Sequence, residues 1–87
     1  MIVPINVPEY DVGRGMRFEW DEGFEIEADV LGSEIRLTAN RAGLISLARQ
    51  LLTLAQDGPP SGHHLHLTAD QEIEGPFDLV LERHDSC

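Results

Sequence analysis

Apolar and charged residues alternate with a period of two between residues 16 and 30. Residues 16–20 alternate apolar and charged side chains, and the alternation resumes over residues 24–30 after the turn Asp21-Glu22-Gly23. This spacing is typical of strands that bury one face. A glycine at the end of a three-residue loop also suits a hairpin with a bulge. We therefore predict a first hairpin that pairs Trp20 with Phe24.

A second hairpin is predicted immediately after the first. The dipeptide Gly32-Ser33 separates two alternating runs, and glycine in the first position of a two-residue loop favours a type II′ turn. This loop would pair Val30 with Ile35 on the inner, apolar face. On the outer face it would place Asp29 opposite Arg36, which is a favourable cross-strand pair.

The spacing of apolar residues changes to a helical period after Asn40, which is a good N-cap residue. The pattern predicts a helix over roughly residues 41–56. Gly58 would end it, and Pro59-Pro60 prevent its continuation. The predicted apolar face consists of Leu44, Leu47, Ala48, Leu51, Leu54 and Ala55, widened by Ile45 and Leu52.

Two further strands are predicted at residues 63–68 and 77–82, where alternation returns on either side of the acidic loop 69–76. Together these elements indicate an α+β fold. We expect a mostly antiparallel sheet of four to six strands, with one helix packed on one face and the other face exposed to water.

The chain length of 87 residues suggests a single domain spanning residues 1–87. A domain of this size buries only about 60–65% of the surface of its unfolded chain. Residues 1–15 contain two prolines and two glycines. We expect them to form an extended N-terminal arm, with a short edge strand near residues 2–7.

The acidic composition limits the classes of macromolecule that the chain is expected to bind. Sixteen acidic residues oppose six basic ones, which are all arginine, and the formal net charge is −10. Because a chain this acidic repels phosphate backbones, we expect no nucleic-acid partner. An acidic surface instead favours basic proteins, whose association it accelerates.

Cysteine content and hydropathy indicate the compartment. Cys87 is the single cysteine, and the chain begins without a basic region followed by an apolar run. These features fit a cytoplasmic protein in a reducing environment. The longest apolar stretch is interrupted by Arg49 and Gln50, so we expect no membrane-spanning segment.

The histidines offer the sharpest chemical motif. His64 and His66 would project from one face of a strand, about 6.6 Å apart. They could chelate a transition metal if Glu82 or His84 supplied a third ligand. The alternative is that both imidazoles bond to carboxylates on the same face. The motif alone is weak, so we predict no metal and no cofactor.

Catalysis is not predicted. None of the serines lies in a strand–turn–helix elbow, and no glycine-rich loop would hold a phosphate. Carboxylates are abundant, but no predicted pocket would raise the pKa of one of them to suit acid–base chemistry. The sequence therefore points to a binding protein rather than an enzyme.

Two segments carry a resemblance to a known family. The run Asn40–Ala55 and the segment Pro60–Leu67, which reads Pro-Ser-Gly-His-His-Leu-His-Leu, resemble immunity protein family thirty-two of bacterial polymorphic toxin systems. The upstream residues Phe18–Trp20 and Phe24–Ile26 and the final run Leu79–Arg83 also fit, so the resemblance covers about residues 17–83. The chain departs from the family pattern at Thr68 and over residues 73–76, in the loop expected to vary with the partner.

This resemblance implies neutralisation of a cognate protein toxin through a stoichiometric complex. The charge suggests a basic nuclease as the toxin. Two alternatives stay open: a metal-binding protein that uses His64 and His66, and a homo-oligomeric structural protein, such as a homodimer joined at an edge strand. The residues that we predict to contact the toxin are Glu25, Glu27, Asp29, Asp70, Glu72 and Glu74, with His64 and His66 at the centre.

Overall fold

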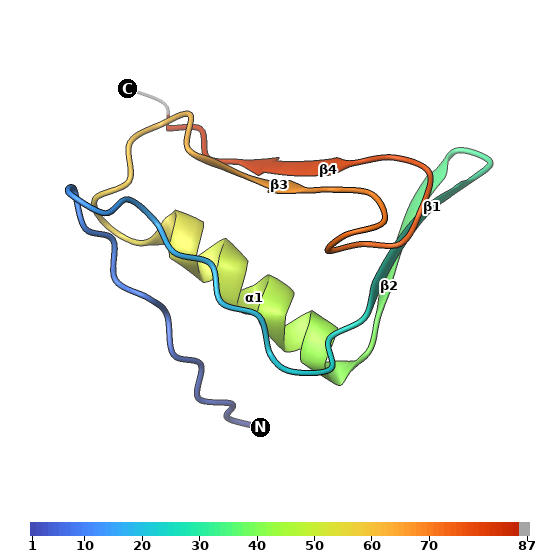
Figure 1. Ribbon diagram of the computed structural model, residues 1–87, viewed down its shortest axis with the longest axis horizontal. Coiled ribbons are helices and arrows are strands. Elements are labelled where there is room, and N and C mark those ends of the chain that lie inside the picture. The colour runs from blue at the N-terminus through green and yellow to red at the C-terminus, as the bar shows by residue number, and fades with distance from the viewer. Residues whose placement is uncertain (86–87) are drawn as a thin grey trace.

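The computed structural model describes residues 1–85 and has an α+β architecture, as predicted. Figure 1 shows one helix at the centre, a two-stranded sheet on one side of it, and a hairpin that projects beyond its N-terminal end. Cys87, the single cysteine, lies outside the described residues. The elements in order are β1 (Ile26–Leu31), β2 (Glu34–Ala39), α1 (Arg41–Ala55), β3 (His64–Leu67) and β4 (Leu79–Glu82).

The hairpin formed by β1 and β2 has the predicted register. Val30 pairs with Ile35 and Asp29 pairs with Arg36 in an antiparallel ladder. The backbone φ angle of Gly32 is 63°, and that of Ser33 is not positive. A positive φ at the first loop residue alone is the signature of the type II′ turn. The local turn chemistry therefore determines this register.

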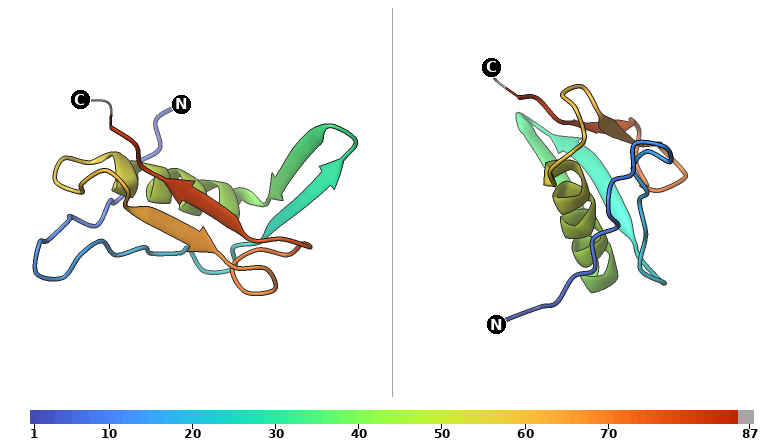
Figure 2. Two further views of the ribbon diagram at one scale, coloured as in Figure 1. Left: turned by 90° about the horizontal axis from the view of Figure 1, so that it is seen from above. Right: turned by 90° about the vertical axis from the view of Figure 1, so that its left-hand side faces the viewer.

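The prediction of one sheet with four to six strands is wrong. The four strands form two separate two-stranded antiparallel sheets, β1–β2 and β3–β4. An isolated parallel bridge between Glu27 and Glu74 ties β1 to the loop that precedes β4. Seen from above, the hairpin extends away from the β3–β4 sheet rather than continuing it (Figure 2).

The first predicted hairpin does not form, because the backbone of residues 16–21 bonds to α1 instead of to a neighbouring strand. The backbone N–H of Asp21 donates to Ser46 Oγ at 2.8 Å, and Gln50 Nε2 donates to the carbonyl of Glu19 at 2.6 Å. Trp20 and Phe24 do meet, but as stacked rings whose centroids lie 4.8 Å apart.

The buried face predicted for α1 is confirmed only in part, since Leu47 and Leu54 are buried as predicted. Asn40 caps the helix as predicted. However, Leu44 is 56% exposed, and Leu51 and Leu52 are also exposed. The helix also turns Ser46 and Gln50 inward, because these two side chains bond to the backbone of the segment that covers them. The buried residues of α1 are Gly43, Ser46, Leu47, Gln50, Thr53 and Leu54.

The apolar face of the hairpin is buried only at its base. Ile26 and Ala28 lie in the core, whereas Val30, Ile35 and Leu37 are exposed. The inward orientation predicted for Val30 and Ile35 is therefore wrong, because no other element within residues 1–85 covers the hairpin tip. The buried core cluster consists of Ile26, Ala28, Leu47, Leu65, Leu67 and Ile73.

The N-terminal segment runs beside α1 without forming the edge strand expected near residues 2–7 (Figure 1). Arg49 Nε donates to the carbonyl of Asn6 at 3.0 Å. Gln56 accepts from the backbone N–H of Tyr10 and donates to the carbonyl of Pro8. Side chains of α1 and of its C-cap residue thus hold this segment. Within residues 1–85, no helix combines the length and the apolar character that crossing a bilayer requires.

Candidate functional site: an acidic cleft at the base of the hairpin

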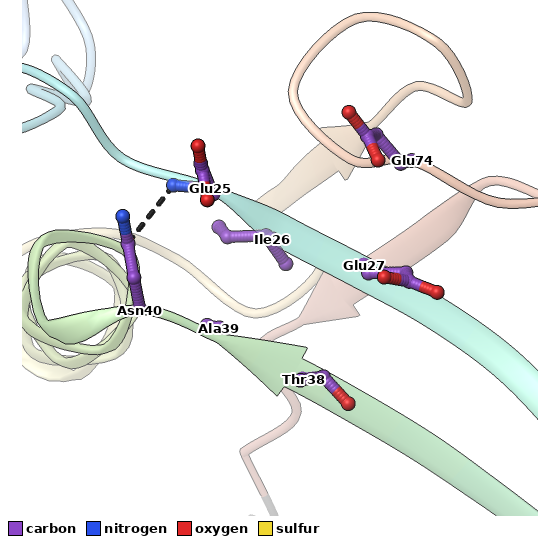
Figure 3. Close-up of a pocket in the computed structure, with 7 residues that line it drawn as sticks. All are labelled: Glu25, Ile26, Glu27, Thr38, Ala39, Asn40 and Glu74. Carbon is purple, nitrogen blue, oxygen red and sulfur yellow. Dashed lines mark hydrogen bonds between the residues drawn. The ribbon is translucent and has the colours of Figure 1, made fainter.

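An open cleft of about 270 Å³ lies where the β1–β2 hairpin leaves the body of the protein. Residues from β1, from the end of β2 and from the loop before β4 meet there (Figure 3). We refer to it as the acidic cleft. Its lining consists of Glu25, Ile26, Glu27, Thr38, Ala39, Asn40 and Glu74.

Two backbone hydrogen bonds bring the loop against β1. The N–H of Ala28 donates to the carbonyl of Glu74, and the N–H of Glu74 donates to the carbonyl of Ile26, both at 2.8 Å. Gly75 follows with a φ of 150°. A Cβ at Gly75 would collide with the carbonyl of Ala28, so the close approach of the loop requires glycine.

Asn40 joins three segments at one end of the cleft. Its Oδ1 accepts from the N–H of Gly43 at 2.8 Å, which caps α1, and from the N–H of Glu25 at 3.0 Å (Figure 3). Its Nδ2 donates to the carbonyl of Gly23 at 2.9 Å. The cap residue therefore also fixes the backbone that carries Glu25.

Three carboxylates share one side of this site. Glu25 and Glu27 are two positions apart, so they lie on the same face of the hairpin. Glu74 is the bridge partner of Glu27, and neighbouring residues on paired strands also share a face. Among residues 1–85, none of these three carboxylates forms an ion pair. The acidic cleft therefore presents uncompensated negative charge to a partner.

The remaining acidic residue predicted on β1 lies farther along the hairpin. Asp29 is exposed, and its Oδ1 accepts from the N–H of Val30. It opposes Arg36 in the ladder, as predicted. The ion pair of Arg36, however, is with Glu34 on the same strand, at 3.8 Å. The charge of Asp29 is therefore not neutralised by the arginine across from it.

The structure does not bring the predicted histidines to the acidic cleft. His64 and His66 are exposed on β3, in the other sheet. Asp70 and Glu72 lie in the loop between β3 and β4, where Asp70 has a φ of 65°. Of the eight residues predicted to contact a partner, Glu25, Glu27 and Glu74 line the cleft.

His66 takes part in a second polar cluster. Its Nε2 lies 2.9 Å from Asp78 Oδ2, while the N–H of Ala69 donates to Asp78 Oδ1 at 2.7 Å. The hydrogen bond from Ala69 and, after it, that from His66 hold the pKa of Asp78 below its ordinary value of 3.8. Asp78 thus ties the loop after β3 to the start of β4.

The proposed metal ligands do not assemble into a set. His64 pairs across the ladder with Glu82, and its Nδ1 lies 3.3 Å from the carbonyl of Gly62. In the part of the chain that the structure describes, no group of three or more histidine, cysteine or carboxylate side chains is placed to hold a metal ion. The arrangement at the acidic cleft suits arginine or lysine side chains instead.

Sequence reasoning missed the two uncharged polar residues of the cleft. Thr38 lines it from β2, and Asn40 lines it in addition to capping α1. The hairpin register, which places Thr38 opposite Glu27, was the signal that could have identified Thr38. Nothing in the local pattern indicated that Glu74 would pair with β1.

Comparison with known proteins gives one family match. The family model described as Immunity protein 32 matches residues 34–84, which include β2, α1, β3 and β4. No curated protein and no solved structure matches the chain.

Proposed function

The chain belongs to the Immunity protein 32 family, and on that premise we propose that it neutralises a cognate protein toxin by forming a stoichiometric complex. In this proposal the protein acts by binding and blocking, not by catalysis. The family match agrees with the resemblance seen in the sequence, and it supports a toxin as the class of partner.

We propose the acidic cleft as the centre of the contact surface. The observation that carries this assignment is the set of carboxylates from Glu25, Glu27 and Glu74, which have no cationic partner within residues 1–85. A partner that supplies arginine or lysine would form charge-assisted hydrogen bonds with them. The net charge of −10 would attract such a partner at long range.

A basic nuclease is the toxin class that fits this chemistry best. Its active site binds phosphate backbones, so it presents positive charge, and an acidic protein can occupy that site in place of the nucleic acid. Asp29, farther out on the hairpin, would extend the contact. The other residues that we propose for the outer part of the interface are His64, His66, Asp70 and Glu72.

The test compares two triple variants with the same net charge. Glu25→Gln, Glu27→Gln and Glu74→Gln neutralise the cleft, while Glu9→Gln, Glu19→Gln and Glu22→Gln neutralise three exposed glutamates elsewhere. Both changes move the formal charge from −10 to −7, because each removes three negative charges. The probe is the purified cognate toxin, and the readout is the association rate at low ionic strength.

We expect the cleft variant to associate about tenfold more slowly than the control variant, since electrostatic steering depends on where the charge lies. Equal rates for the two variants would overturn the assignment of the cleft. Reversal of Glu72 and Glu74 to arginine tests the cleft together with the adjoining loop: an unchanged association rate at low salt would exclude both from the interface.

A further inference from the structure

The outer edge of β2 has unpaired backbone groups. In an antiparallel ladder, alternate residues direct their N–H and C=O groups away from the partner strand. On β1 these residues are Ile26 and Ala28, which bond to Glu74. Leu37 pairs with Ala28, so Leu37 and, two positions away, Ile35 direct their backbone groups away from β1. Within residues 1–85, no backbone hydrogen bond from another segment reaches them.

The side chains beside this edge form an apolar surface that no other part of the described chain covers. Ile35 is 75% exposed, Val30 is 51% exposed and Leu37 is 44% exposed. All three lie on the same face of the hairpin, as the register requires. An open edge next to exposed apolar side chains is a template for pairing with another strand.

We propose that a second copy of this chain pairs with that edge, β2 against β2 in antiparallel orientation, to form a four-stranded sheet across a two-fold axis. The axis would pass beside Ile35, whose outward backbone groups would bond to those of the partner's Ile35. Each Glu34 would then face the partner's Arg36, and each Arg36 the partner's Glu34. A two-fold axis always creates such a reciprocal pair of contacts.

Charge complementarity selects this register. Glu34 and Arg36 lie on one face of β2, 3.8 Å apart between their charged atoms. The proposed register joins them in two reciprocal opposite-charge pairs between copies, at non-hydrogen-bonded positions where side chains are closest. A shift of two residues would place Arg36 opposite the partner's Arg36. A shift of one residue would put apolar side chains opposite charged ones.

The same features favour a second copy over an unrelated strand. The edge carries one negative and one positive residue around an isoleucine, so it is complementary to itself when reversed. The inference does not depend on the proposed toxin binding, since it uses the edge of β2 and the apolar face, not the acidic cleft. The net charge of −10 opposes association, so the measurement needs about 0.15 M salt, which screens repulsion between distant charges.

The test is a charge-swap experiment followed by sedimentation equilibrium from micromolar to several hundred micromolar protein. Glu34→Arg alone would place arginines opposite arginines, and Arg36→Glu alone would place glutamates opposite glutamates. We expect each to raise the dimer dissociation constant about tenfold or more. An equimolar mixture of the two, and the double variant in one chain, should restore dimerisation, because every pair is again of opposite charge.

Matched controls separate this effect from net charge and from misfolding. Glu22→Arg and Arg17→Glu make the same charge changes at exposed positions outside the hairpin, and we expect them to dimerise like the unmodified chain. Far-ultraviolet circular dichroism checks that every variant is folded. A monomeric unmodified chain over the whole concentration range, or a mixture that stays monomeric, would overturn the proposal.

Discussion

The substitution Asn40→Ala removes the side chain that connects α1, β1 and the turn before β1. The alanine variant loses three hydrogen bonds: from Gly43 and Glu25 to Oδ1, and from Nδ2 to the carbonyl of Gly23. No bulk is added, and the φ of −78° at this position is accessible to alanine. The change therefore tests these bonds and not the packing of the chain.

The expected cost follows from the three bonds. Loss of an N-cap typically costs about 1 kcal/mol. Each of the other two bonds contributes about 0.5 kcal/mol, at the low end of the usual range, because Asn40 is exposed and water can replace its partners. The sum is about 2 kcal/mol. Against a total stability on the order of 5 kcal/mol for a domain of this size, that is a large fraction.

Urea unfolding followed by circular dichroism at the helix band measures this cost. We expect a lower midpoint with an unchanged slope, since the surface exposed on unfolding stays the same. The melting temperature should fall by about 8–16 °C. Asn6→Ala is the control: Asn6 is exposed and is bonded through its carbonyl, so the free energy of unfolding should stay within about 0.5 kcal/mol. An equally small effect for Asn40→Ala would refute the reasoning.

Three further predictions concern other links of the fold. Gly43→Ala should destabilise the protein by about 1 kcal/mol in urea unfolding. A Cβ there would lie 2.5 Å from the carbonyl oxygen of Glu25, and this clash outweighs the usual preference for alanine over glycine in helices. Arg83→Met should cost about 1–2 kcal/mol in the same assay, since its guanidinium bonds to carbonyls at the C-terminal end of α1. Asp78→Asn should lower the free energy of unfolding by an amount that depends on pH. The difference from the unmodified chain should be fully present above pH 3.8 and should vanish as the pH falls through the lowered pKa of Asp78. A difference independent of pH would contradict the hydrogen bond from Ala69.

The parts of the fold that the sequence predicts are those determined by neighbouring residues. The loop Gly32-Ser33 determines the register of the hairpin, and Asn40 determines where α1 begins. Both depend on backbone conformation over a few residues, which the residue type controls directly. The strand limits of β3 and β4 also fall within the predicted ranges.

The assembly of these parts depends on contacts between distant residues, which periodicity does not reveal. Ser46 and Gln50 resemble polar interruptions of an apolar helix, yet they are fully buried because they bond to the segment that covers them. Those bonds replace a strand ladder for residues 16–21. Because the backbone of residues 16–21 bonds to α1 and not to a neighbouring strand, both the number of strands in the sheet and the orientation of α1 differ from the prediction.

The candidate site likewise combines features that neighbouring residues determine with a contact between distant residues. The alternation over residues 24–30 puts Glu25 and Glu27 on one face, and both are exposed. The arrival of Glu74 beside them depends on a bridge between residues that are 47 positions apart, which is the difference between 74 and 27. The shared acidic character of loop and hairpin was visible in the sequence, but the contact between them was not.

The central claim is that this chain neutralises a toxin by binding it. The most direct measurement titrates the purified chain into a fixed amount of its cognate toxin and records the remaining toxin activity. We predict a linear fall that reaches zero near one equivalent of the chain, as expected for a tight stoichiometric complex. Toxin activity that stays unchanged in an excess of folded chain would contradict the account.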